Sequence, residues 1–410
     1  MRVAFHSRLA LSTLAAAMLA SACTSDPIEP EPDPLAAPGN VAATATSNTT
    51  AQISVDPVTG ATGYRVQRAD GAAGANFAVV GNPASSPFTD SGLSSTTAYS
   101  YRVAAVSGPE VSDYSAAVTV TTQAVPVQPV TQNITTNTTW TSDKVWLLQG
   151  FIKVTNGATL TIEAGTTIKG DFNTLGSSLF ILRGARIQAS GTEAAPIIFT
   201  SSQPAGQRLA GDWGGVIIVG DGIINRGSPV ILEGTGTSAA NPQVDYSGGT
   251  NNADNSGTLR YVRIEFAGFG AAPNVELNTL TLAAVGSGTT LDHIQAMHGL
   301  DDSFEWFGGA VDSKYLVSYN PGDDHFDASE GYIGRNQFLI AFQNARVVPR
   351  PPGILATDPQ GMENDGCAGA NCLNGELSQP LTLPMFANFT LVGVPSTVTP
   401  TSSGDIGMMI

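Results

Sequence analysis

The sequence contains few charged residues, and basic residues are the scarcer kind. Only 13% of its 410 residues are charged, and 18 Lys and Arg residues stand against 34 Asp and Glu residues, giving a net charge of -16. Proteins that bind nucleic acid need a basic surface along the phosphate backbone. The charge balance therefore predicts no nucleic-acid partner. It permits divalent cations, and it also fits an ordinary acidic, soluble surface.

Helical periodicity is also absent from the sequence, as are several motifs of well-known catalytic sites. There is no Gly-x-Ser-x-Gly nucleophile elbow, no P-loop and no dinucleotide fingerprint followed by a helix. The chain has instead 45 Gly and 25 Pro, with many Thr, Ser and Val, a composition that favours short strands and frequent turns. We therefore predict an all-β protein, and no reaction follows from its motifs.

Cysteine is scarce too, with three residues in the whole chain. Cys367 and Cys372 lie close together in a stretch rich in Gly and Asn, where a local disulfide is expected if the protein is exported. The alternative is a pair of free thiols. Two cysteines without a histidine nearby in the sequence make a poor zinc site.

The chain begins with the features of an export signal. Arg2 and Arg8 accompany an apolar run at residues 9–22, which is too short to span a membrane. Residues 19–23 read LASAC and resemble a bacterial lipobox, although Ala20 stands where that pattern prefers Leu. The alternative is an ordinary secretory cleavage site. The resemblance implies a lipid on Cys23, and the lack of an aspartate directly after it implies the outer membrane.

We therefore expect residues 1–22 to be a lipoprotein signal peptide. Residues 23–36 are acidic and rich in Pro, and we expect them to form an extended tether. A lipid on Cys23 would anchor the exported protein to the outer membrane or cell surface without a transmembrane segment.

Residues 37–123 contain roughly seven short alternating segments, which is typical of a small β-sandwich. The segments GYRV, FTD and YSYRV in this stretch resemble a fibronectin type III domain, with Tyr99 at the tyrosine-corner position. Asp56 falls near the place of the family's core Trp, which is a departure from the pattern. Domains of this family are mainly spacers and binding platforms, and we expect a spacer here.

Residues 124–135 are expected to be a linker, and residues 136–410 to form a parallel β-helix. The passage LDDSFE recurs as GDDHFD, so that Asp301 and Asp323 are 22 residues apart. A repeat of this length in β-rich sequence is typical of a coil whose rungs stack on one another.

The apolar residues ahead of this passage keep the same offset. Ile294 is followed 22 residues later by Leu316 and then by Phe338. The longer step of 30 residues from Ile264 to Ile294 predicts an inserted loop near residues 268–274.

Longer segments carry a further resemblance. GDWGGVIIVG, SGTLRYVRIEFAG and DDSFEWFGGAVDSKYLVSY are similar to a family of bacterial secreted and surface proteins, and the similarity covers most of residues 131–392. The resemblance implies a right-handed parallel β-helix of the pectin-lyase-like class and a location at the cell surface. It implies no activity or substrate, and it implies that this chain stops early at its C-terminus.

The repeated acids create an electrostatic problem. If 22 residues make one rung, the pairs Asp301–Asp323 and Asp302–Asp324 lie about 5 Å apart, where like charges repel by roughly 3 kcal/mol at an effective dielectric near 20. Four remedies remain open. The four aspartates bind a metal such as Ca²⁺, one member of each pair is protonated as in catalytic dyads, Arg346 neutralises them, or they cap turns.

The alternation of side chains along a strand predicts the direction of a second set of residues. With Phe304 and Phe326 directed inward, we expect Glu305, His325 and Asp327 on the exposed face. With Trp306 these three would form a ligand-binding groove suited to sugars, because aromatic faces pack on sugar rings and carboxylates bond hydroxyls.

The same acids are also candidates for catalysis. A glycosidase needs two carboxylates about 5 to 9 Å apart, so Glu305 and Asp327, with His325, are candidate catalytic residues. A lyase would need a nearby cation, for which Lys314, Arg335 and Arg346 are available. We expect a lipid-anchored surface protein whose β-helix is a binding or structural module for polysaccharide. The alternative is a polysaccharide lyase or glycoside hydrolase.

Overall fold

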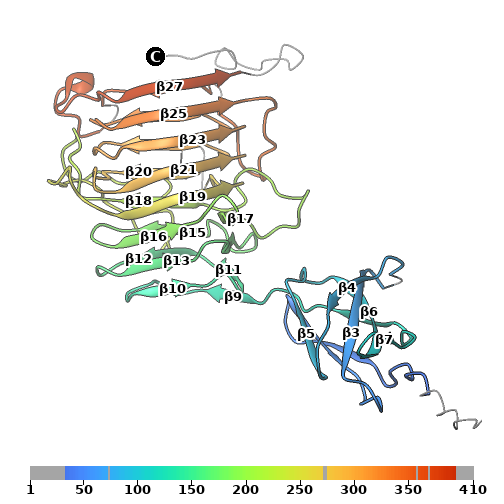
Figure 1. The fold of residues 1–410 in the computed structure, drawn as a ribbon. Coiled ribbons are helices and arrows are strands. Elements are labelled where there is room, and N and C mark those ends of the chain that lie inside the picture. Colours follow the sequence, from blue (N-terminus) through green and yellow to red (C-terminus); the bar gives the residue numbers. More distant parts are fainter. Residues whose placement is uncertain (1–32, 73, 271–274, 357–358, 368–369, 394–410) are drawn as a thin grey trace, which may run out of the picture. The chain divides into compact units, whose positions relative to one another are not determined.

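A computed structural model of the protein describes residues 33–72, 74–270, 275–356, 359–367 and 370–393. The chain divides into two compact units, Met1–Ala124 and Val125–Ile410 (Figure 1). The expected signal peptide, Cys23, most of the tether and the end of the chain lie outside the described residues. Within the described part, no helix is long and apolar enough to cross a membrane.

The first unit is a sandwich of two antiparallel sheets. One sheet has the order β1 (Ala42–Ala45), β2 (Thr50–Ser54), β5 (Phe88–Ser91). The other has the order β4 (Ala78–Gly81), β3 (Gly63–Asp70), β6 (Ala98–Ser107), β7 (Glu110–Val111), and β8 (Val118–Thr121) also pairs with β6.

The two sheets enclose one apolar core, to which Ile53, Tyr101 and Val103 contribute buried side chains. The hydroxyl of Tyr99 accepts a hydrogen bond from the backbone nitrogen of Ser94 at 2.9 Å. This bond to a residue upstream is the mark of a tyrosine corner. The sheet order and the corner confirm the prediction of a fibronectin type III-like sandwich.

The second unit is a parallel β-helix made of two stacks of strands (Figure 1). The twelve-stranded sheet contains β9 (Val127–Val130), β10 (Thr138–Trp140), β11 (Val145–Leu148), β13 (Thr159–Ile162), β14 (Thr167–Gly170), β16 (Arg186–Ser190), β17 (Ile197–Ser201), β19 (Gly257–Glu265), β21 (Thr290–Met297), β23 (Ser313–Tyr319), β25 (Arg335–Phe342) and β27 (Met385–Val392). The seven-stranded sheet contains β12 (Phe151–Val154), β15 (Ser178–Ile181), β18 (Gly215–Val219), β20 (Leu280–Ala283), β22 (Phe304–Phe307), β24 (Phe326–Ser329) and β26 (Glu363–Asn364). The pairings in both stacks are parallel, which confirms the predicted architecture.

The strands of the twelve-stranded sheet become long and bent from β19 onward. Strand β19 pairs with β16 through its first half and with β17 through its second half. Its bend falls at Tyr261, whose φ is +47°. The residues in register with Tyr261 on the next rungs are His293, Tyr315 and Phe338, with φ values of +53°, +55° and +62°. A left-handed residue at the same place in each rung turns the chain in the same way each time.

Residues 124–135, which we expected to be a linker, contribute to the first rung instead. Strand β9 lies in this segment and pairs with β11, and Ile134 bridges to Val154. The pairing satisfies backbone groups that would otherwise be left at an open sheet edge.

The acidic repeat sets the register of the seven-stranded sheet. Phe304 pairs with Phe326, and Glu305 pairs with Asp327. The two Phe rings are buried and stacked, with their centroids 5.5 Å apart. The 22-residue rung and the inward direction of these rings are therefore confirmed.

The register of the bent strands differs from the expected one. Ile294 pairs with Leu316, as expected, but Leu316 pairs with Leu339 and not with Phe338. The partner of Ile294 on the preceding rung is Val262 and not Ile264. The rung that follows Leu316 is one residue longer than the repeat, and this difference moves Phe338 from the core to the bend.

The insertion expected near residues 268–274 lies partly outside the described residues, and a longer insertion that was not expected covers one sheet. Residues 220–256 run between β18 and β19, and we call this segment the cover. Its residues Val230, Leu232 and Tyr246 join Phe180 and Ile217 of the seven-stranded sheet in a second apolar core. Phe180 and Ile217 are apolar side chains on the outer side of this sheet, so burying them beneath the cover is favourable.

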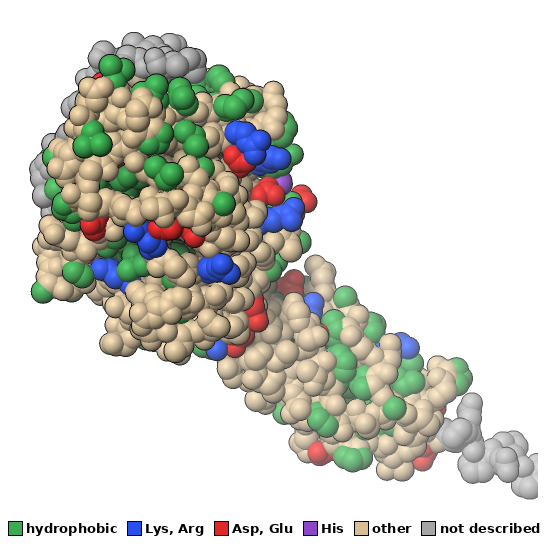
Figure 2. Space-filling view, turned by 90° about the vertical axis from the view of Figure 1, so that its left-hand side faces the viewer, with side chains coloured by type: hydrophobic (Ala, Val, Ile, Leu, Met, Phe, Trp, Pro, Cys, Tyr) green, Lys and Arg blue, Asp and Glu red, His purple; other side chains and the backbone are tan. Residues whose placement is uncertain are grey.

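The surface of the described residues carries few charges. On the face shown in Figure 2, uncharged side chains dominate and charged ones gather in small groups. Exposed apolar side chains are common on the last bent strands, and include Tyr315, Phe338, Ile340, Phe342 and Val392. Cys367 and Cys372 form a disulfide bond in the segment between β26 and β27.

We predict that Phe304→Ala lowers the free energy of unfolding by about 3–5 kcal/mol. The buried ring stacks on both Trp306 and Phe326, so its removal leaves a cavity in the core. Chemical denaturation followed by tryptophan fluorescence measures the loss. Val348→Ala is the control, because Val348 is 65% exposed and is expected to change stability little. Equal losses in the two variants would contradict the placement of Phe304.

Candidate functional site

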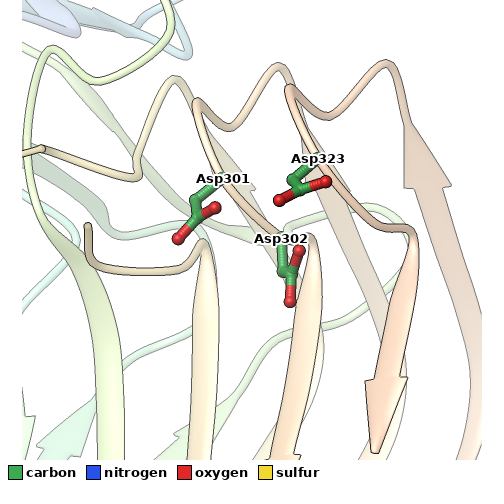
Figure 3. A group of neighbouring side chains, drawn as sticks. All are labelled: Asp301, Asp302 and Asp323. Carbon is green, nitrogen blue, oxygen red and sulfur yellow. The ribbon is translucent and has the colours of Figure 1, made fainter. Parts of the chain in front are cut away.

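The repeated acids lie at the bends that lead into β22 and β24. Asp301 and Asp302 precede β22, and Asp323 precedes β24. The carboxylates of these three residues point toward one another from neighbouring turns (Figure 3). One oxygen from each lies within 4.8 Å of the others. The predicted neighbourhood of Asp301 and Asp323 is thus present in the structure.

A second acidic group adjoins the first. Asp302 also lies with Glu305 and Asp327, again with one oxygen of each within 4.8 Å of the others. Glu305 and Asp327 are in register on the outer side of the seven-stranded sheet, and Asp327 is in register with Glu363 on the next rung. Three successive rungs therefore place an acid in one column, and Asp302 links this column to the bends.

The cover adds another acid to this centre. Asn278 donates a hydrogen bond from Nδ2 to Glu233 of the cover at 2.6 Å and another from Nδ2 to Glu305. Asn278 therefore joins the cover to the seven-stranded sheet. We call the set Glu233, Asp301, Asp302, Glu305, Asp323, Asp324, Asp327 and Glu363 the acidic centre.

Some of these aspartates also cap turns. Asp302 accepts a hydrogen bond at Oδ1 from the backbone nitrogen of Asp324 at 2.9 Å, and Asp324 accepts one at Oδ1 from the backbone nitrogen of Gln360. One rung earlier, Asn278 accepts the corresponding bond at Oδ1 from the backbone nitrogen of Asp302 at 3.1 Å. Turn capping is thus confirmed for Asp302 and Asp324, and it uses one oxygen of each.

Burial makes the ionised forms of these acids costly. Burial first, and then the neighbouring carboxylates, raise the pKa of Asp301, Asp302, Glu305 and Asp327 well above the ordinary values. The same causes raise the pKa of Asp324 to about 11. Two unit charges 5 Å apart repel by about 3 kcal/mol at an effective dielectric near 20. The centre therefore needs protons or cations to offset its charge.

The expected exposed groove at Glu305 is not present. Trp306 is 0% exposed and lies in the core, where its ring stacks on Tyr332 at 5.5 Å. It follows Phe304 by two residues, so the alternation that directs Phe304 inward also directs Trp306 inward. Glu305 does point outward, but it is only 6% exposed because the cover lies over it.

His325 is also buried, at 6% exposure, and it faces the inside of the coil. Its Nδ1 is hydrogen-bonded to the hydroxyl of Ser318 at 2.6 Å, and Ser318 donates to Ser303 at 2.6 Å. Burial lowers the pKa of His325 to about 4, so its ring is neutral at physiological pH. Ser303 and His325 sit in the bends, where strand alternation does not yet apply.

Two of the three basic residues considered for a lyase lie on the twelve-stranded sheet. Lys314 and Arg335 belong to strands β23 and β25 of the twelve-stranded sheet, and Arg335 pairs with Asp312. Arg346 donates a hydrogen bond to the backbone oxygen of Ala356 at 3.4 Å. The groups that act most strongly on the acidic centre are its own carboxylates.

A groove on the outer side of the bent strands was not expected from the sequence. Its floor contains the left-handed residues of successive rungs, with ring centroids 4.4 Å apart for His293 and Tyr315 and 4.8 Å apart for Tyr315 and Phe338. Tyr261 stacks on His293 from the preceding rung at 4.5 Å. Asn388 follows Phe338 in register and also has a positive φ, of +53°.

The groove has a volume of about 510 Å³ and is lined by His293, Ile294, Gln295, Tyr315, Val317, Phe338, Leu339, Ile340, Asn388 and Thr390. Tyr315 is 43% exposed and Ile340 is 45% exposed, so the apolar side chains are open to solvent. The signal in the sequence was the recurrence of an aromatic residue just before Ile294, Leu316 and Leu339. The expected alignment of Phe338 with Leu316 was wrong by one residue, and for this reason the column of aromatic residues was not recognised in the sequence.

We predict that stability falls as the pH rises from 7 to 9 in buffer free of divalent cations. The acids titrate near pH 4 in the unfolded chain, and the folded state raises their pKa, that of Asp324 to about 11. An acid whose pKa is raised in the folded state contributes its full stabilisation below the pKa of the unfolded chain. This contribution is lost as the pH rises toward the pKa of the folded state. Each carboxyl protonated only in the folded state contributes a slope of about 1.4 kcal/mol per pH unit.

Thermal melts at pH 7, 8 and 9 measure this slope, in a range that lies above the ordinary pKa of histidine. Asp324→Asn is the matched variant, because an amide cannot ionise, and its slope is expected to be shallower than that of the parent protein. A thermal midpoint that stays constant or rises between pH 7 and 9 would contradict the prediction.

Comparison with solved structures gives fibronectin type III domains for the N-terminal part of the chain. The FN5 domain of Drosophila Lar is 26% identical, with 22% of this chain and 98% of that chain covered and a TM-score of 0.20. An Fn3-like protein from Clostridium thermocellum is 29% identical, with 21% and 90% covered and a TM-score of 0.20. The third fibronectin III domain of human KIAA0343 protein is 21% identical, with 22% and 84% covered and a TM-score of 0.20.

No curated protein is significantly similar to this chain in sequence. The family model described as a pectate-lyase-like β-helix domain matches residues 132–404, which is more than half of the chain. This match agrees with the parallel stacks of the second unit and supports a carbohydrate-related module. The chain belongs to the family of proteins with a pectate-lyase-like β-helix domain.

Proposed function

We propose that the protein is an exported, lipid-anchored surface protein whose β-helix binds polysaccharide in the groove of the twelve-stranded sheet. The observation that carries the proposal is the uncovered aromatic column at the bend of successive rungs. The fibronectin-like unit then acts as a spacer, and the membership in a pectate-lyase-like family supports a carbohydrate as the ligand.

The form of the groove suits a long, extended ligand. It crosses β21, β23, β25 and β27, which follow one another at a rung spacing of about 4.8 Å. This spacing is comparable to the length of one sugar residue in an extended chain, so successive sugars would meet successive rungs.

The groove combines apolar surface with polar side chains. Because Tyr315 and Phe338 stack on each other, they turn ring edges and not ring faces to the groove, and Val317 and Ile340 add apolar surface beside them. The polar lining side chains Gln295, Asn388 and Thr390 can bond sugar hydroxyls. An apolar surface with a few polar groups is the usual composition of a ligand site.

The acidic centre fits the alternative of a lyase or hydrolase less well. Glu305 is 6% exposed because the cover lies over it, so a polysaccharide could reach this acid only if the cover moved. A glycoside hydrolase would also need two acids of the acidic centre beside the substrate. Binding in the open groove requires no such movement.

We predict that Tyr315→Ala combined with Phe338→Ala weakens polysaccharide binding by about tenfold or more, as expected when exposed aromatic anchors are lost. Affinity electrophoresis or calorimetry against a panel of neutral and acidic polysaccharides measures the change. Leu377→Ala is the control, because Leu377 is 65% exposed and lies outside the groove.

Binding that is equal in the groove variant and the control would overturn the groove as the site. The same incubations are tested for new reducing ends and for unsaturated products. If these products form and Glu305→Gln abolishes them, the enzyme alternative replaces the binding proposal.

We also predict that Cys23→Ala moves the protein from the membrane fraction to the soluble fraction. The substitution removes the thiol that would carry the lipid, and with it the anchor. Fractionation of cells that express each form, followed by immunoblotting, measures the distribution. A variant that remains in the membrane fraction would refute the lipid anchor, whereas Cys367→Ala, the control, is expected to leave the distribution unchanged.

A further inference from the structure

The acidic centre has a geometry that a single class of ion would complete. Its two groups, Asp301–Asp302–Asp323 and Asp302–Glu305–Asp327, each bring one oxygen per residue within 4.8 Å of the others. Calcium binds oxygens at 2.3–2.6 Å, so two oxygens on the same ion lie at most about 5 Å apart. Both groups satisfy this limit, and Asp302 belongs to both.

Turn capping does not explain why these residues are acids. Asn278, Asp302 and Asp324 occupy equivalent places two residues before β20, β22 and β24. With an uncharged amide oxygen, Asn278 accepts the same kind of bond from the bend of the next rung, at 3.1 Å from the backbone nitrogen of Asp302. A neutral side chain therefore suffices for this bond, so the bond by itself does not account for the carboxyl groups of Asp302 and Asp324.

Further oxygens around the acids lack hydrogen-bond partners among the described residues. These are Oγ1 of Thr281, Oε1 of Gln360 and Oδ1 of Asp327. Thr281 is 2% exposed and lies in the same outward column as Glu305, and Gln360 is 8% exposed. A buried oxygen without a partner is destabilising unless a ligand completes its bonding.

Gln360 is attached to the acidic centre at two points. Its backbone nitrogen donates to Asp324, and its side-chain nitrogen donates to Glu363 at 3.5 Å. The amide nitrogen is thus directed to one acid, which leaves the unpartnered Oε1 beside the centre as a further neutral donor to a cation.

The available donor atoms are all oxygen. They come from carboxylates, an amide and a hydroxyl, whereas His325 faces the inside of the coil and is bonded to Ser318. Cys367 and Cys372 are joined to each other. Oxygen donors without imidazole or thiolate select hard cations, and a large flexible set of them selects Ca²⁺.

We infer that the acidic centre binds Ca²⁺ and that the bound ion fastens the cover to the seven-stranded sheet. Glu233 belongs to the cover, whereas Glu305 and Asp327 belong to strands β22 and β24. An ion that neutralises these acids removes their repulsion at the boundary between the two parts. The inference is independent of polysaccharide binding, because the groove lies on the twelve-stranded sheet.

The first test is calcium binding by the whole protein after treatment with a chelator. Calorimetric titration with CaCl₂ is expected to show saturable binding, and a hundredfold excess over Kd is expected to raise the thermal midpoint by roughly 5–10 °C. Asp302→Asn, which alters the residue shared by both groups, is expected to weaken Ca²⁺ binding by about tenfold or more.

Asp212→Asn is the matched control. Asp212 is a buried aspartate of the same unit, at 0% exposure, and it belongs to neither acidic group. This variant is expected to keep the calcium-induced rise of the thermal midpoint. If Asp302→Asn does not fold, Glu305→Gln takes its place, because an amide preserves the shape of the side chain.

The inference is overturned if the parent protein binds no Ca²⁺, or if the acidic-centre variant and Asp212→Asn respond to Ca²⁺ equally. Hydrogen exchange tests the fastening of the cover. Removing Ca²⁺ is expected to speed exchange in residues 220–256 and to leave strands β21 and β23 protected. Unchanged exchange in the cover, or equally faster exchange throughout the β-helix, would overturn this part of the inference.

Discussion

In a parallel β-helix each residue lies directly beside its counterpart on the next rung, about 4.8 Å away. A side chain on one rung is therefore close to the side chain at the same place on the next rung. Where the repeated residue is apolar, as for Phe304 and Phe326, the columns form a continuous core. Where it is acidic, as for Glu305 and Asp327, the same spacing concentrates charge of one sign. This stacking constraint produces both the stability of the fold and its principal electrostatic problem.

The two sheets treat their outer faces in different ways. The seven-stranded sheet is covered by residues 220–256, which pack on outward apolar side chains in the early rungs and bring Glu233 to the acids of the later ones. The last rungs of the twelve-stranded sheet are open, and their outward side chains include exposed aromatic and aliphatic residues. The covered face thus carries the acidic centre, and the open face carries the groove. The proposed polysaccharide groove and the proposed Ca²⁺ site consequently lie on different sides of one coil.

The bends of the long strands connect these features to local backbone conformation. A left-handed residue is unfavourable for most side chains, yet Tyr261, His293, Tyr315 and Phe338 all adopt it. Their rings stack on one another along the coil, and this contact offsets part of the backbone cost. The groove is therefore a product of the stacking that also fixes the bend.

The sequence by itself determined the composition of the rungs. The two copies of the acidic passage established the 22-residue step, the pairing of Phe304 with Phe326 and the contact between acids of neighbouring rungs, because identical spacing in a stacked coil implies contact. The tyrosine at position 99 and the strand pattern around it determined the sandwich. Only the tertiary structure decided which faces are exposed. Glu305 points outward as alternation requires, but a cover from a distant part of the chain buries it, and His325 turns inward at a bend where alternation does not apply. One additional residue in a single rung moved Phe338 from the core to the groove, since register in a strand depends on the count of residues and not on their type.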